Sequence, residues 1–377
     1  MNQPQHGGNL TWAAAIVGCP PSAILDFSAS ISPLGPPPSG LTAIQSHLND
    51  LRSYPDPNYQ QLRSVLGAAH DLPPEWILPG NGAAELLTWA GWDLSTLSGT
   101  FLITPAFGDY QRCLRAVNAQ AIACPLDLTV PNPPGQPLPL SPQSTHPPRA
   151  ECGLLLNNPH NPTGQLFSLE AIAPHLAEFP LVVVDEAFMD FLPPGDQQSV
   201  IHLVPDHTNL VILRSLTKFY SLPGLRLGYA IAHPDRLQRW QQWRDPWPVN
   251  VLAAAAGAAA IRDTDFQQQT WAWLPPARSQ LFATLAQLPG LRPFPSAANF
   301  LLVHCDFSVS QLQQHLLKRH RILIRDCLSF PELGDRFFRI AIRLPEDNQR
   351  LCDALADVLS SSPDHLPPPT PPQPNKP

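Results

Sequence analysis

The chain is organised around one stretch, Arg214-Ser-Leu-Thr-Lys-Phe-Tyr-Ser-Leu-Pro-Gly-Leu-Arg-Leu-Gly-Tyr229. The apolar run before it, Leu210 to Leu213, predicts a strand, so Lys218 is expected close to a strand end. A lysine in that position can form a Schiff base with an aldehyde cofactor. The residues that could bind a phosphate of the same cofactor are Ser215, Thr217 and Arg226. Because lysine and arginine are mostly exposed, a solvated lysine beside a turn explains this stretch equally well on its own.

Length and charge exclude several classes of protein. The 377 residues allow one large domain and one smaller domain. A net charge of -7 provides no basic surface for nucleic acid or for an anionic membrane, so a small-molecule partner is expected. No window reaches the roughly 18 apolar residues that a membrane span needs.

The cysteines and the amino terminus indicate a cytoplasmic protein. Seven cysteines are scattered, odd in number and without a Cys-x-x-Cys pair, which predicts reduced thiols and neither a disulfide framework nor a metal site. The first residues lack the basic start and apolar run of a signal peptide. His6-Gly7-Gly8-Asn9 is expected to be a disordered leader, because two glycines there leave the backbone free.

A glycine turn near residue 80 is a candidate anion site. Gly80-Asn81-Gly82-Ala83-Ala84-Glu85 lies between an apolar run, Trp76 to Leu78, and a helical segment that continues through Trp92. Small residues at a helix start leave backbone N–H groups open to an anion, which the helix dipole also favours. A glycine turn without a ligand is the alternative.

An alternation of apolar runs and helical segments follows. Gly153 to Leu156, Leu181 to Val184 and Leu210 to Leu213 are each succeeded by polar residues. This pattern predicts an α/β fold whose mostly parallel sheet binds ligands at the carboxyl ends of its strands. Asp185 follows the second run, and a carboxylate there is costly unless it pairs with a cation such as a protonated pyridine nitrogen. Capping of a following helix is the alternative.

The pattern changes after Tyr229 to that of a smaller α+β module. Its predicted helices are Pro234 to Arg244, Val249 to Ile261, Phe266 to Leu288, Ser310 to His320 and Asp347 to Leu359. Its predicted strands are Asn299 to His304, Arg321 to Ile324 and Phe337 to Ile342. We therefore expect residues 1–45 to form an arm and part of the small domain, 46–245 the large domain and 246–360 the small domain. The Pro-rich segment 361–377 is expected to be disordered.

Arginines are dense in this module. Arg321 and Arg325 bracket one predicted strand, and Arg339 and Arg343 lie at the two ends of another. Because strand side chains alternate between faces, the members of each pair are expected on one side. Two such pairs could bind a substrate that carries both a phosphate and a carboxylate. The alternative is that Arg321 and Arg343 are solvated, so Arg325 and Arg339 are our substrate candidates.

Several motifs together resemble one enzyme family. They are Tyr54-Pro55-Asp56-Pro57, Gly80-Asn81-Gly82, Asn161-Pro162-Thr163-Gly164, Asp185-Glu186-Ala187 and the Lys218 stretch. In this order they resemble the histidinol-phosphate aminotransferase group of class I/II aminotransferases, which have fold type I and use pyridoxal 5'-phosphate (PLP). The resemblance spans nearly the whole chain apart from the tail. Within the group, several segments are similar to a branch that decarboxylates threonine phosphate for cobalamin biosynthesis. They are His6-Gly7-Gly8-Asn9, Asp26-Phe27-Ser28, Arg214 to Tyr229, Pro246-Trp247 through Asn250, Arg321 to Arg325 and Arg339 to Arg343.

The resemblance implies roles for individual residues. Lys218 would hold PLP covalently, Asp185 would pair with its ring nitrogen and Asn161 would bond its phenolic oxygen. The residues implied for the cofactor phosphate are Gly82, Ala83, Ser215, Thr217 and Arg226, with Tyr54 reaching in from the second subunit of a homodimer. Phe107 could stack on the cofactor ring. The residues assigned to the substrate are His6, Ser30, Asn161, Arg325 and Arg339.

Departures from the family pattern leave alternatives open. Phe188 stands where histidinol-phosphate aminotransferases usually have tyrosine. A hydroxyl near the cofactor oxygen is therefore missing, as it is in the decarboxylase branch. Ser30 and Ser32 stand where that branch has asparagines. A transaminase would use the same cofactor pocket, since the reactions differ only in which Cα bond stands perpendicular to the ring. The alternative that is not an enzyme is a binding or regulatory module with the same fold. The presence of Lys218 disfavours it.

Overall fold

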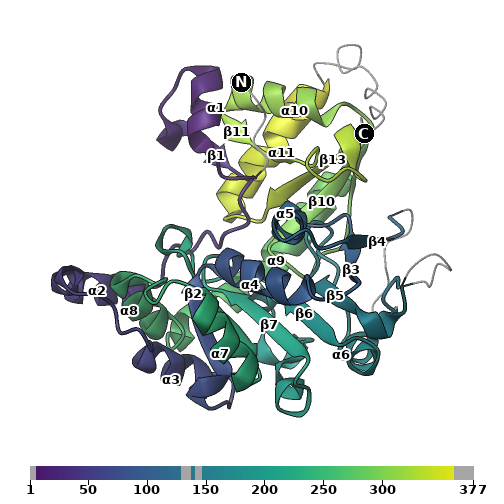
Figure 1. Ribbon diagram of the computed structural model, residues 1–377. Coiled ribbons are helices and arrows are strands. Elements are labelled where there is room, and N and C mark those ends of the chain that lie inside the picture. The colour runs from purple at the N-terminus through teal and green to yellow at the C-terminus, as the bar shows by residue number, and fades with distance from the viewer. Residues whose placement is uncertain (1–5, 129–136, 141–146, 361–377) are drawn as a thin grey trace. The chain divides into compact units, whose positions relative to one another are not determined.

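The computed structural model describes residues 6–128, 137–140 and 147–360, and these form two compact units (Figure 1). The larger unit comprises the described residues of 34–161 and 165–271, and the smaller comprises those of 1–33, 162–164 and 272–377. This division places residues 34–45 and 246–271 with the larger unit, whereas the predicted limits assign them to the smaller domain. The predicted disorder of residues 361–377 falls outside the described residues.

A seven-stranded sheet forms the centre of the larger unit, in the order β2-β8-β7-β6-β5-β3-β4. The strands are β2 (Ile77–Asn81), β3 (Gly99–Thr104), β4 (Ala121–Pro125), β5 (Cys152–Asn157), β6 (Leu181–Asp185), β7 (Leu210–Ser215) and β8 (Leu227–Ala232). Among these strands β8 runs antiparallel to both of its neighbours, β2 and β7, and the remaining neighbouring pairs are parallel. The predicted α/β fold with a mostly parallel sheet is confirmed.

Burial on both faces explains the uninterrupted apolar runs. All residues of β3, β5, β6 and β7 are buried, as expected where helices cover both sides of a parallel sheet. One cluster packs strand residues such as Leu155 and Val183 against three helices. These are α4 (Ala83–Leu94), α5 (Gly108–Ala116) and α7 (Pro234–Trp243), which contribute Leu86, Leu114 and Trp240. Figure 1 shows α4 and α7 crossing in front of the strands. Burial of this apolar surface is the main favourable contribution to folding.

The helices of the larger unit include two, at 234–243 and 251–260, that were predicted for the smaller module. The helices of this unit are α2 (Pro38–Ser46), α3 (Gln60–Ala68), α4 (Ala83–Leu94), α5 (Gly108–Ala116), α6 (Leu169–Ile172), α7 (Pro234–Trp243), α8 (Val251–Ala260) and the first part of α9 (Thr264–Ala286). Short 3₁₀ segments include η2 (Leu48–Arg52), η5 (Ala173–Ala177), η8 (Ile201–Asp206) and η9 (Pro223–Leu225). No helix within residues 6–128, 137–140 and 147–360 is both long and apolar enough to cross a membrane.

The smaller unit contains two separate sheets. β1 (Leu25–Asp26) pairs in parallel with β11 (Ile322–Leu323). The second sheet is antiparallel, in the order β12 (Arg325–Asp326), β13 (Phe337–Ala341), β10 (Phe300–Cys305) and β9 (Leu291–Pro293). The helices are α1 (Leu10–Val17), the rest of α9, α10 (Val309–His315), the wider turn η10 (Leu316–His320) and α11 (Pro345–Ser360).

The predicted strand from Arg321 to Ile324 is wrong in one respect that concerns the arginines. The chain leaves one sheet after Leu323 and joins the other at Arg325, so Arg321 and Arg325 do not bracket a single strand. Arg321 has a left-handed backbone, with φ of 55°. Arg343 lies beyond the end of β13 and forms an ion pair with Asp347, 2.9 Å away. The expectation that each arginine pair points to one side therefore fails for Arg321 and Arg325, whereas the side chains of Arg339 and Arg343 both donate to carbonyls of the segment 26–28.

Candidate active site

Three parallel strands end side by side in polar residues. In the strand register Asn157 of β5 lies opposite Asp185 of β6. The Asn157 side-chain amide donates to the Asp185 carbonyl at 2.8 Å, and the backbone N–H of Asn158 donates to the same oxygen at 2.9 Å. On the other side, Glu186 N–H donates to the carbonyl of Leu213 in β7 at 2.8 Å. These bonds fix the strand end that carries the Asp185 carboxylate.

The Asp185 carboxylate is buried and accepts hydrogen bonds from neutral donors. The hydroxyl of Tyr110 donates to Oδ2 at 2.8 Å, and the backbone N–H of Ala187 donates to Oδ1 at 3.0 Å. Burial raises the pKa of Asp185, while these two bonds and the nearby charge of Lys218 lower it. A buried carboxylate with neutral donors suits a cationic ligand group, because the cation would offset the desolvation of the charge.

Lys218 is half-buried in the loop that follows β7. Its charge lowers the pKa of Asp185, so the amine and the carboxylate lie near each other. Lys218 follows the last residue of β7, Ser215, by three positions, so it lies close to a strand end as predicted. An amine close to a buried carboxylate is positioned to react with an aldehyde whose ring nitrogen meets that carboxylate.

The predicted phosphate residues converge on Gly228 of β8. This strand lies between β2 and β7. Gly228 is therefore paired in register with Gly80 of β2 on one side and with Ser215 of β7 on the other. A Cβ atom at Gly228 would lie 2.5 Å from the backbone nitrogen of Ala83, so only glycine allows this approach. Ser215 Oγ and Thr217 Oγ1 are 2.7 Å apart and buried.

Gly82 and Arg226 complete this group. Gly82 precedes α4 with φ of +76°, a conformation that favours glycine. A Cβ atom at Gly82 would lie 2.6 Å from Nη2 of Arg226. Glycine at this position therefore leaves room for the guanidinium close to the amino end of α4. A positively charged side chain beside the first N–H groups of a helix forms a favourable site for phosphate.

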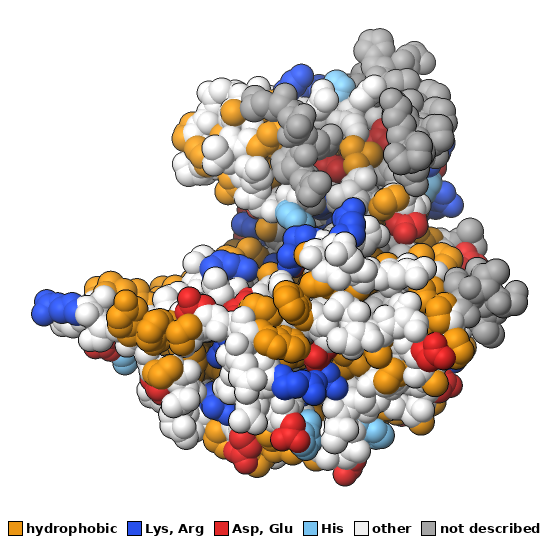
Figure 2. Space-filling model, viewed as in Figure 1, with side chains coloured by type: hydrophobic (Ala, Val, Ile, Leu, Met, Phe, Trp, Pro, Cys, Tyr) orange, Lys and Arg blue, Asp and Glu red, His pale blue; other side chains and the backbone are white. Residues whose placement is uncertain are grey.

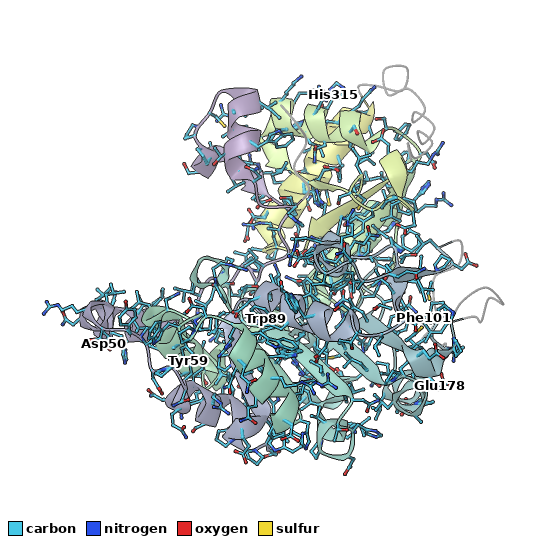
Figure 3. The ribbon with its side chains drawn as sticks, viewed as in Figure 1. Asp50, Tyr59, Trp89, Phe101, Glu178 and His315 are labelled. Carbon is cyan, nitrogen blue, oxygen red and sulfur yellow. The ribbon has the colours of Figure 1, made fainter. Side chains whose placement is uncertain are left out.

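Glu85 braces this glycine turn, a role that sequence patterns did not reveal. Its Oε2 accepts from the backbone N–H of Asn81 at 2.6 Å, and its Oε1 accepts from the Trp89 indole at 3.1 Å. Trp89 lies one turn further along α4 (Figure 3). Glu85 thus connects the turn to the first two turns of the helix. The i, i+4 spacing of Glu85 and Trp89 is the signal that could have indicated this contact.

Asn161 and Phe107 lie in the same unit as this group. The backbone N–H of Asn161 donates to Oδ1 of Asn157 at 2.6 Å, and Asn161 is buried. Phe107 immediately precedes α5 and is half-buried. Its ring meets that of Tyr110 edge to face, with centroids 5.6 Å apart.

Tyr54 lies on the surface of the larger unit. It is 78% exposed, and its ring stacks on that of Trp247 with centroids 4.4 Å apart. Two residues beyond Trp247, the backbone N–H of Val249 donates to the hydroxyl of Tyr59, which is labelled in Figure 3, at 3.0 Å, and this hydroxyl donates to the Val249 carbonyl at 3.0 Å. Tyr54 therefore belongs to a defined aromatic surface of its own chain.

Two arginines form the second predicted group, in the smaller unit. Arg325 of β12 and Arg339 of β13 are register partners. Arg325 is buried and donates to Ser329 Oγ at 2.6 Å, and Arg339 lies over the Phe300 ring, 4.9 Å from its centroid. Burial and the charge of Arg325 lower the pKa of Arg339 to about 10. Two cations held this close favour an anionic ligand.

The amino-terminal arm packs beside Arg325. A hollow there is lined by His6, Gly7, Gly8, Asn9, Trp12, Ser28, Gln313, Leu323, Ile324, Arg325 and Asp326. A Cβ atom at Gly7 would lie 2.1 Å from the Ser28 carbonyl oxygen, and Gly8 N–H donates to Ser28 Oγ at 2.8 Å. The expected disordered leader is thus wrong from His6 onward, because these glycines allow a close contact that sequence patterns do not reveal.

Three further polar side chains belong to the smaller unit. Gln313 was not predicted, and Ser30 and Ser32 are the departures from the family pattern noted above. Gln313 donates to the Ile324 carbonyl at 2.8 Å and to Asp326 Oδ2 at 3.1 Å, next to Arg325. Ser30 and Ser32 are buried. Within the described part of the chain, the hydroxyl of Ser30 has no hydrogen-bond partner. An unsatisfied buried hydroxyl is costly, so a ligand oxygen would be a favourable partner for Ser30.

Comparisons with known proteins agree with this arrangement. A family model described as aminotransferase class I and II matches residues 22–355. Threonine-phosphate decarboxylase of Salmonella typhimurium is 39% identical over 94% of this chain and 96% of its own length. Histidinol-phosphate aminotransferase of Symbiobacterium thermophilum is 33% identical over 89% of this chain and 91% of its own. The crystal structure of L-threonine-O-3-phosphate decarboxylase from Porphyromonas gingivalis has the same fold, with a TM-score of 0.79 and 24% identity over 89% of this chain and all of that one.

Proposed function

Because the chain belongs to the aminotransferase class I and II family, we propose that it is a PLP-dependent decarboxylase of L-threonine O-3-phosphate. The observation that carries this proposal is 39% identity, over nearly the whole chain, to a threonine-phosphate decarboxylase. The product would be (R)-1-amino-2-propanol O-2-phosphate, which the resemblance assigns to cobalamin biosynthesis. Catalysis requires a cofactor site and a site for a doubly charged substrate, and each has support in the residues described.

The larger unit supplies the residues that would hold PLP. Lys218 would bind it covalently, and Asp185 would hold a proton on its ring nitrogen. The groups available to its phosphate are the amino end of α4 at Gly82 and Ala83, the hydroxyls of Ser215 and Thr217, and the guanidinium of Arg226. Asn161 and Phe107 would contact the ring. When bound, PLP supplies an electron sink for the bond that breaks at the substrate's Cα.

The smaller unit supplies the residues that would bind the substrate's anionic groups. Arg339 would bind the carboxylate, and Arg325 and His6 the phosphate. The paired arginines favour a dianion, because a ligand with two negative charges offsets the repulsion between them. Ser30 would donate its hydroxyl to a phosphate oxygen. In this way the chain would orient the Cα–carboxylate bond, and that orientation selects decarboxylation over transamination.

The reaction type is tested by product analysis. Purified protein with PLP and threonine phosphate, without any keto acid, should release carbon dioxide over many turnovers. A histidinol-phosphate-type aminotransferase is the alternative, since a relative of that kind is 33% identical. It would instead stop after one half-turnover, with pyridoxamine phosphate accumulating, and would resume when 2-oxoglutarate is added. That outcome would contradict the decarboxylase.

We also propose that the protein is a homodimer. An exposed apolar surface, which we call the α2 surface, lies on the larger unit and consists of Leu41, Leu48, Leu51, Tyr54 and Trp247. Each of these side chains is between 41% and 78% exposed. Figure 2 shows hydrophobic side chains gathered at the left of the larger unit, where Figure 1 labels α2. Such patches commonly mark interaction sites, and a second copy would bring Tyr54 to the cofactor phosphate as the family resemblance implies. Sedimentation as a monomer at micromolar concentration, with full activity, would contradict this.

A further inference from the structure

Tyr110 contacts the cofactor-site carboxylate directly, although sequence patterns assign it no role. Its hydroxyl donates to Asp185 Oδ2 at 2.8 Å across 75 residues of chain. The side chain is 2% exposed and lies in the first turn of α5, which the following residues anchor to the core cluster through Cys113 and Leu114. The bond therefore links a rigid helix to the end of β6.

The groups around Asp185 oppose one another in their effect on its charge. Burial raises its pKa, the Tyr110 hydroxyl and the Ala187 N–H lower it, Lys218 lowers it further, and Asp109 raises it. Burial and the charge of Asp185 raise the pKa of Tyr110 well above its ordinary value. The phenol consequently keeps its proton and remains a hydrogen-bond donor at every physiological pH.

We propose that Tyr110 is a positioning residue that keeps Asp185 ionised and oriented, so that the proton between this carboxylate and the PLP ring nitrogen rests on the nitrogen. The inference rests on PLP binding in the proposed function. A carboxylate that accepts hydrogen bonds is stabilised in its charged form, and the effect is larger where water is excluded. A proton held on the nitrogen makes the bound ring a better electron acceptor.

The test compares wild type with Tyr110→Phe, which removes only the hydroxyl. Both proteins are loaded with PLP carrying ¹⁵N in the ring, and the nitrogen shift is followed as a function of pH. In the variant the nitrogen should lose its proton about one pH unit or more lower, because a hydrogen bond to a charged group is lost. The matched control is Tyr229→Phe, whose equally buried hydroxyl bonds His70 Nε2 at 2.8 Å. It should leave the nitrogen titration unchanged.

The outcomes separate this inference from the proposed function. If Tyr110→Phe binds PLP with an unchanged titration, Tyr110 has only a packing role and the inference is overturned, while PLP binding stands. If wild type binds no PLP, both fail. Should Tyr110→Phe not fold, 3-fluorotyrosine introduced at position 110 keeps the hydroxyl and makes it a stronger donor. The nitrogen should then hold its proton to higher pH, and a titration that stays the same or moves lower would overturn the inference.

Discussion

Arg325 and Arg339 lie directly opposite each other on antiparallel strands β12 and β13. Like charges in directly opposed positions destabilise a strand pair, and the charge of Arg325 contributes to the lowered pKa of Arg339. Asp326 offsets part of this repulsion, with its Oδ2 3.9 Å from Arg325 Nη1. An arrangement that is unfavourable without ligand and favourable with an anion is typical of a binding site.

Removing one charge of this pair should raise stability and weaken binding. Arg339→Met removes the repulsion from Arg325, although it also removes the contact between the Arg339 guanidinium and the Phe300 ring, and we expect the ligand-free protein to gain roughly 2 °C in Tm. The KM for threonine phosphate should rise at least tenfold, while PLP affinity stays the same. Differential scanning calorimetry and steady-state kinetics measure both effects. Arg343→Met is the control: its guanidinium pairs with Asp347, so neither increase is expected. A lower Tm with an unchanged KM for Arg339→Met would contradict the assignment.

Covalent cofactor binding should depend on Lys218 and on no other lysine. The chain has three lysines, Lys218, Lys318 and Lys376. Lys218→Ala should abolish the near-visible absorbance band and the adduct that borohydride fixes, because no other amine lies near Asp185 in the described residues. Lys318→Ala, which removes an exposed lysine of the smaller unit, should retain both. An adduct that persists in Lys218→Ala, located by peptide mass spectrometry, would show another attachment site.

A composite dimer should show complementation between two inactive variants. Tyr54→Phe keeps the ring that stacks on Trp247 and removes the hydroxyl proposed to reach the partner's cofactor. In a mixed dimer with Lys218→Ala, one of the two sites has neither lesion. Random mixing in equal amounts should therefore restore roughly one quarter of the wild-type activity, given a symmetric two-fold interface. Activity no greater than the sum of the separate proteins after subunit exchange would exclude Tyr54 from the partner's site.

Acid should destabilise the protein through His160. This side chain is 1% exposed, and burial lowers its pKa to about 3 from 6.5. The unfolded chain binds the proton first as pH falls below 6.5, so the stability of the folded state is lost progressively between pH 6.5 and 3. His160 alone should cost about 2 kcal/mol between pH 6.5 and 5.0.

Urea unfolding at pH 7.5 and 5.0 measures this effect. His160→Gln should be less stable than wild type at pH 7.5, with the difference between them smaller at pH 5.0. The control is His207→Gln, the same substitution at a histidine that is not fully buried. A constant difference between His160→Gln and wild type at the two pH values would show that His160 is not held neutral.

The sequence by itself determined the central sheet and the order of its polar strand ends. Buried parallel strands require continuous apolar residues, and the turns after them require glycine, proline and polar residues. Both signals are local, so the runs that became β5, β6 and β7 were recognisable, together with Asp185 and Lys218 at or just beyond their ends. Local patterns also indicated the glycine turn before α4.

The tertiary structure alone decided which distant residues meet. Register pairs Arg325 with Arg339, and packing of α5 on the sheet brings Tyr110 to Asp185. It also split the predicted Arg321 strand between two sheets and exposed the leucines of the α2 surface. Periodicity reports which face of an element is apolar, but it contains no information about the partner across that face. Register and long-range side-chain bonds are set by the cooperative packing of the whole unit, and for that reason these contacts could not be predicted from the chain alone.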